Sequence, residues 1–81
     1  MIPKYPTQGQ ALLHALSANA MSRAELARLT GLSPSAITYY CNGEKIMSLL
    51  NAAKIAQALG VSLEYLATGE PPHSANALRG R

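Results

Sequence analysis

The side chains best suited to chemistry in this sequence are hydrogen-bond donors and cations that lie between residues 23 and 45. Guanidinium and ammonium groups suit phosphate oxygens, whereas hydroxyl and amide groups suit the polar edges of bases. The pattern therefore indicates noncovalent binding rather than bond making. The candidate contact residues are Arg23, Ser35, Thr38, Tyr39, Asn42 and Lys45.

Catalytic and metal chemistry find no support in the residue types. The sequence has no Asp, its four Glu are scattered, and no nucleophile has a His or Lys partner at a recognisable spacing. The single cysteine, Cys41, excludes an internal disulfide, and no second Cys or paired His stands at metal-ligand spacing. We expect a chain that is not an enzyme and needs neither metal nor cofactor, with Cys41 packed as a small hydrophobe.

Length and composition favour one small helical domain. The chain has 81 residues, of which 48% are apolar, but it has no Trp or Phe, so Ala, Leu, Ile and Val must build the core. The formal charge of +3 is weak evidence for a polyanionic partner, because Arg79 and Arg81 supply part of it from a predicted tail. No signal peptide and no apolar run of roughly 20 residues is present, so we expect a soluble, cytoplasmic protein without a membrane partner.

The first two helices are predicted from their start and stop signals. Thr7 is placed to cap a helix that runs to about Ala18. Residues 22–25 (SRAE) have the form of a capping box that starts a second helix, and Gly31 ends it. The apolar stripe of this second helix is predicted to comprise Leu26, Ala27, Leu29 and Thr30.

A third helix follows almost at once, because Ser33 can act as its N-cap and Pro34 suits its first position. The Asn-Gly pair at 42–43 tolerates positive φ and ends it. Ile37 and Tyr40 are expected to face the core.

Two further helices complete an all-α fold of five helices without a strand. Ser48 caps the fourth helix and Gly60 ends it, and Ser62 and Gly69 bound a short fifth helix before two prolines. The fourth helix is expected to bury Leu49, Ala52, Ile55, Ala56 and Leu59. The expected organisation is an N-terminal arm (1–6), a helical domain (7–69) and a flexible tail or linker (70–81).

The second and third helices have the spacing of a helix-turn-helix, in which a three-residue turn lets the second helix protrude into a DNA major groove. Ala27 is small where the helices cross, Gly31 permits the sharp turn, Leu32 fills the corner, and Ile37 anchors the reading helix. We therefore predict residues 23–31 as the positioning helix and residues 33–42 as the reading helix.

Residues 22–33 (SRAELARLTGLS) and 54–62 (KIAQALGVS) together resemble the Cro/C1-type family of bacterial and phage repressors, over roughly residues 7–69. The resemblance implies a compact, lambda-repressor-like DNA-binding domain. It also implies that the residue opening the second helix clamps a phosphate, that residues early in the third helix touch bases, and that the following loop holds the DNA backbone. The positions that match are Arg23, Ser35, Thr38 and Asn42.

Two departures from the family pattern concern the reading helix and its entrance. A glutamine is common where Arg23 stands, and a base-reading polar side chain is common where this chain has Pro34. Pro34 can touch an apolar group such as a thymine methyl but donates no hydrogen bond, so hydrogen-bonded base recognition is expected to fall to Ser35, Thr38 or Tyr39, with DNA shape contributing. Lys45, in the loop before the fourth helix, suits a phosphate.

The resulting expectation is a sequence-specific transcriptional regulator, a repressor that binds a palindromic double-stranded DNA operator as a homodimer. The candidate dimer contacts are Leu50, Leu63, Tyr65 and Leu66, which otherwise close the core. The alternative expectation is an antitoxin or adaptor of the same fold that acts mainly through a protein partner.

Overall fold

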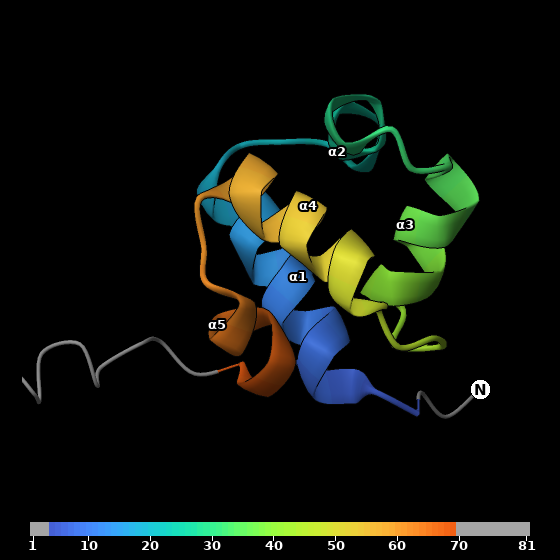
Figure 1. Cartoon of the computed structure of the whole chain (residues 1–81), viewed down its shortest axis with the longest axis vertical. Helices are drawn as coiled ribbons and strands as arrows, with labels where there is room; N and C mark the ends of the chain where they lie inside the picture. Colours follow the sequence, from blue (N-terminus) through green and yellow to red (C-terminus); the bar gives the residue numbers. More distant parts are fainter. Residues whose placement is uncertain (1–3, 70–81) are drawn as a thin grey trace, which may run out of the picture.

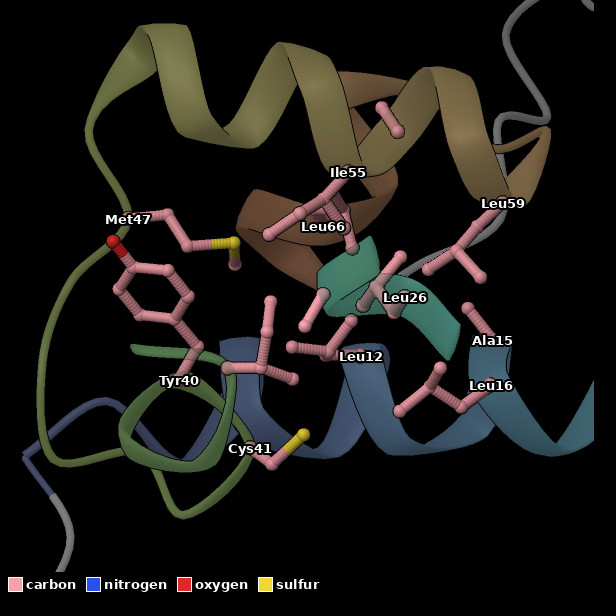
Figure 2. Packing of buried hydrophobic residues seen from close by; sticks show 13 residues of the cluster. Leu12, Ala15, Leu16, Leu26, Tyr40, Cys41, Met47, Ile55, Leu59 and Leu66 are labelled. Carbon is pink, nitrogen blue, oxygen red and sulfur yellow. The ribbon is translucent and has the colours of Figure 1, made fainter. Parts of the chain in front are cut away.

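The computed structural model describes residues 4–69, and within this range the fold is all-α, as predicted. Helix α1 lies near the middle of the view in Figure 1, where α4 overlaps it, and core side chains lie between these two helices in Figure 2. Contacts join α1 to α3 and α5, α2 to α3 and α4, and α4 to α5. The five helices are α1 (Pro6–Ala18), α2 (Arg23–Thr30), α3 (Pro34–Cys41), α4 (Leu49–Leu59) and α5 (Leu63–Thr68).

Serine side chains start four of the five helices, as their positions in the sequence predict. At α2 the Ser22 hydroxyl accepts from the Glu25 N–H at 3.0 Å, and the Ser22 N–H donates to the Glu25 carboxylate at 3.1 Å, which completes the capping box. Each such cap is worth about 1 kcal/mol of helix stability. The other three capping serines are Ser33, Ser48 and Ser62, with hydrogen bonds of 2.9 to 3.1 Å.

The predicted start of the first helix is wrong. Thr7 does not cap α1, because the helix begins at Pro6 and its N-cap, Tyr5, makes no side-chain capping bond. Proline at the first helical position is preorganised for the helix and leaves no N–H unpaired. The Tyr5 N–H donates instead to the Gly43 carbonyl at 2.8 Å, which ties the entry of α1 to the end of α3. Pro6 is therefore part of a helix and not of an extended arm, and the predicted tail lies outside the described residues.

The core is formed by all five helices. Figure 2 shows Tyr40 and Met47 at one end of it and Leu59, Ala15 and Leu16 at the other. Burying a leucine or isoleucine side chain stabilises a fold by about 1.5–3 kcal/mol, so the buried leucines and isoleucines contribute most to the stability of the domain. The fully buried side chains are Leu12, Leu26, Ile37, Ile55 and Leu66.

Three leucines depart from their predicted environments. Leu29 is 60% exposed because it lies outside the arc of α2 that Leu26, Ala27 and Thr30 bury. Leu49 is 77% exposed, because it lies in the first turn of α4 and lines a surface groove rather than the core. Leu66, a candidate dimer contact, is 1% exposed within the domain and is therefore a core residue.

Candidate nucleic-acid interface

The turn between α2 and α3 has the predicted form. Gly31 takes a left-handed φ of 76°, and its N–H donates to the Ala27 carbonyl at 2.9 Å, which closes α2. Only glycine adopts this conformation without strain. Ala27 and Ile37 are buried, and Leu32 packs half-buried against the core. The roles predicted for Ala27, Gly31, Leu32 and Ile37 in packing α2 against α3 are thus confirmed.

The structure brings Ser35, Thr38 and Tyr39 together on the outer face of α3. Ser35 and Tyr39 are exposed and Thr38 is half-buried. With Pro34 they line an open hollow of about 270 Å³. Figure 1 shows α3 at one edge of the molecule and α5 toward the opposite edge, so this face of α3 is not covered by the rest of the fold.

The loop after α3 folds back onto the helix and brings in a fourth predicted residue. The Glu44 N–H donates to the Tyr39 carbonyl at 2.9 Å. The Lys45 ammonium consequently lies over the Tyr39 ring, 4.5 Å from its centroid, in cation–π geometry. An exposed cation and an exposed aromatic ring are thereby held side by side.

Asn42 is exposed at the end of α3, but its side chain has a protein partner. The Asn42 Nδ2 donates to a Glu44 carboxylate oxygen at 3.4 Å. Glu44 was not among the predicted site residues. Its negatively charged carboxylate repels a phosphate at this end of α3. The Asn42 Nδ2 carries a second hydrogen, which remains available for a contact with the DNA backbone.

Arg23 is exposed at the start of α2, near the C-terminal end of α3. Burial raises the pKa of the Cys41 thiol, and the nearby Arg23 guanidinium opposes this by favouring the thiolate. Arg23 and Asn42 thus lie toward one end of α3, whereas Pro34 and Ser35 lie at the other. The structure thus brings Ser35, Thr38, Tyr39 and Lys45 together, whereas Arg23 and Asn42 do not line the same hollow.

Two contacts that sequence reasoning missed hold α3 in place. The Asn51 Nδ2 of α4 donates to the Tyr40 hydroxyl at 2.9 Å, which links the inner face of α3 to α4. A Cβ at Gly9 of α1 would lie 2.7 Å from the Cys41 carbonyl oxygen, so only glycine allows α1 and α3 to approach this closely. A glycine inside an otherwise good helix was the available sequence signal for Gly9.

Pro34 is also absent from the predicted contact residues. It lines the hollow on α3 beside three of the predicted contact residues. Its place at the first position of the reading helix was the signal that could have included it. Residues 4–69 contain no cluster of three metal-ligating side chains and no helix long and apolar enough to span a membrane.

Comparisons with known proteins place the chain in a family. A family model described as helix-turn-helix matches residues 17–66. The chain is 49% identical over 47 residues to an uncharacterised HTH-type transcriptional regulator of Haemophilus influenzae, covering 58% of this chain and 20% of that protein. It is 36% identical over 64 residues to the HTH-type transcriptional regulator for conjugative element SXT of Vibrio cholerae, covering 79% of this chain and 29% of that protein.

A solved structure matches over most of both chains. The crystal structure of the restriction-modification controller protein C.AhdI from Aeromonas hydrophila superposes with a TM-score of 0.71 at 33% identity, covering 75% of this chain and 92% of that one. By contrast, the chain spans less than a third of the curated regulators it matches. On the family model and this structural match, the chain belongs to the helix-turn-helix family, and within it to the Cro/C1 type that includes transcriptional regulators.

Proposed function

We propose that this protein is a sequence-specific, double-stranded DNA-binding regulator of transcription that acts in the cytoplasm as a repressor. The observation that carries the proposal is the uncovered outer face of α3, where Ser35, Thr38 and Tyr39 project from a helix fixed by a three-residue turn. A helix presented in this way fits a DNA major groove. Membership of a family of transcriptional regulators supports the same function.

The proposed roles divide by position and charge. Arg23, at the start of α2, and Lys45, in the loop after α3, contact phosphates, which orients the reading helix without reading sequence. Ser35, Thr38 and Tyr39 face the base edges, and Asn42 contacts the DNA backbone through the N–H that Glu44 does not use. Lys45 in addition holds the Tyr39 ring in place.

The proposed dimer uses an exposed apolar surface. The α4–α5 patch, as we call it, consists of Ile46, Leu49, Leu50 and Leu63, which are 40–77% exposed. Ile46, Leu49 and Leu63 line one groove of about 290 Å³, whose lining is mainly apolar. A contiguous apolar surface of this kind marks a protein contact. Pairing two chains through it would serve a palindromic operator whose half-sites lie about 34 Å apart, one turn of DNA.

A mobility-shift titration with duplexes selected from a random-sequence pool tests the proposal. Binding that weakens steeply when the salt concentration rises supports phosphate-anchored recognition, because each neutralised phosphate releases counterions. The α4–α5 patch also favours a second candidate, an adaptor that grips a partner protein. If no duplex is shifted and the protein forms a stable complex with another protein, the adaptor function would replace DNA binding as the proposed function.

A further inference from the structure

Helix α3 lacks every side chain that makes a bidentate contact with a base. Helix α3 has the sequence PSAITYYC and therefore contains no Arg, Lys, Asn, Gln, Asp or Glu. Guanine is typically read by Arg or Lys, and adenine by Asn or Gln, through two hydrogen bonds each. What α3 offers instead are hydroxyl groups and apolar surface.

The nearest amide and cation are held beyond the C-terminal end of α3. The Asn42 amide donates to Glu44 at 3.4 Å, and the Lys45 ammonium lies over the Tyr39 ring. Neither group lies at the N-terminal half of the helix, where Pro34 and Ser35 stand. Base reading by this half of α3 must therefore use small hydroxyls and hydrocarbon.

The hollow on α3 combines these two kinds of surface. Its lining residues are Pro34, Ser35, Thr38 and Tyr39, whose side chains carry hydrocarbon as well as hydroxyl groups. Its volume of about 270 Å³ accommodates the edge of a base. Lys45, stacked on Tyr39, steadies the aromatic wall.

We propose, on the basis of the DNA-binding function proposed above, that this hollow reads the 5-methyl group of a pyrimidine in the major groove. The 5-methyl of thymine is the apolar group that base pairs display there, and the O4 acceptor lies beside it. Pro34 and the Thr38 methyl cover the methyl group, and a hydroxyl of Ser35 or Thr38 donates to O4. 5-Methylcytosine presents the same methyl beside an amino group, from which a hydroxyl accepts.

Replacing thymine by uracil removes only the methyl group and therefore tests the proposal. The probe is the tightest duplex recovered by the full chain from a random-sequence pool, with each thymine replaced singly by deoxyuridine. Replacement of one or two particular thymines in each half-site should raise the Kd about fourfold, because this is the change expected from the loss of one buried methyl group. If no single replacement changes the Kd by as much as about twofold, the methyl group is not read.

Variants of the hollow assign the effect to α3. Pro34→Ala and Thr38→Ser should each reduce the preference for the thymine duplex over the uracil duplex, because each removes part of the hydrocarbon while the Ser33 cap remains. The matched control is Pro6→Ala, a proline at the first position of α1, which should keep the discrimination. Discrimination that persists unchanged in Pro34→Ala and Thr38→Ser would place the methyl contact elsewhere and overturn the proposal.

Two further duplexes distinguish the sources of the methyl group. With cytosine at the sensitive position binding should fall, and 5-methylcytosine should restore it if the methyl alone is read. If thymine restores binding and 5-methylcytosine does not, the hollow recognises thymine through its O4 as well as its methyl group. Failure to recover any duplex would instead refute DNA binding itself, whereas tight binding without a uracil effect refutes only this inference.

Discussion

Arg23→Ala should weaken DNA binding for every sequence and lower its salt dependence. The guanidinium is exposed at the first position of α2, and the capping box beside it uses only Ser22 and Glu25. Alanine is a good helix former, so the variant keeps its fold. The change therefore removes one phosphate contact and little else.

The magnitude follows from the cations on the proposed interface. Each chain contributes Arg23 and Lys45, so a dimer neutralises four phosphates, and log K should fall with log salt at a slope of about −3.6. A fourfold rise in salt then weakens binding about 150-fold. Arg23→Ala leaves two phosphate contacts, a slope of about −1.8 and a loss of about 12-fold.

Fluorescence anisotropy with a labelled duplex measures both slopes. The matched control is Lys54→Ala, which removes the same charge from an exposed position on α4 and should leave the slope unchanged. An unchanged slope for Arg23→Ala, or an equal reduction for Lys54→Ala, would refute the phosphate contact. A scrambled duplex should lose as much affinity as the selected one.

The remaining predictions concern specificity, assembly and stability. Thr38→Ala should reduce the ratio of affinities for the selected and scrambled duplexes by about tenfold, which is the value of one base contact. Fluorescence anisotropy with both duplexes measures this ratio, and an unchanged ratio would exclude Thr38 from base reading. Leu49→Lys should convert the proposed dimer to monomers, as measured by sedimentation equilibrium. The control Leu29→Lys changes an exposed leucine outside the α4–α5 patch and should leave the dimer intact. Equal effects of the two variants would contradict the proposed interface. Gly9→Ala should destabilise the fold by about 2 kcal/mol, because its Cβ would lie 2.7 Å from the Cys41 carbonyl oxygen. Thermal unfolding checks this, with exposed Gln10→Ala as the control, and an equal or higher Tm would contradict the close approach. Burial raises the pKa of Cys41 above its ordinary value of 9.0, so the unfolded chain ionises first as the pH rises, and the stability of the wild type relative to Cys41→Ala should fall above that pH. Urea unfolding at about pH 7 and about pH 10 measures the difference, and a constant difference would exclude a shifted thiol.

Local signals were sufficient for most of the fold. Ser22, Ser33, Ser48 and Ser62 cap the helices they were predicted to cap, because a cap depends on side chains within three residues. The turn at Gly31 was predictable for the same reason. The start of α1 was misplaced: the helix begins at Pro6, and the hydrogen bond from Tyr5 to Gly43 at its entry is a long-range contact that local signals do not predict.

Burial and the fine geometry of the site depended on packing that periodicity does not specify. Leu29 and Leu49 fit apolar stripes, yet no neighbouring helix covers them, whereas Leu66 is covered completely. The residue types of the candidate site were readable from the sequence. The stacking of Lys45 on Tyr39 was not, because it depends on how the loop after α3 folds back.

Amide chemical-shift mapping of the labelled chain, titrated with its selected duplex, tests the central claim that α3 is the DNA-reading surface. The largest shifts should fall on Arg23, on residues 35–42 and on Lys45. If the largest shifts instead fall on the α4–α5 patch while the amides of α3 stay unmoved, α3 does not read DNA.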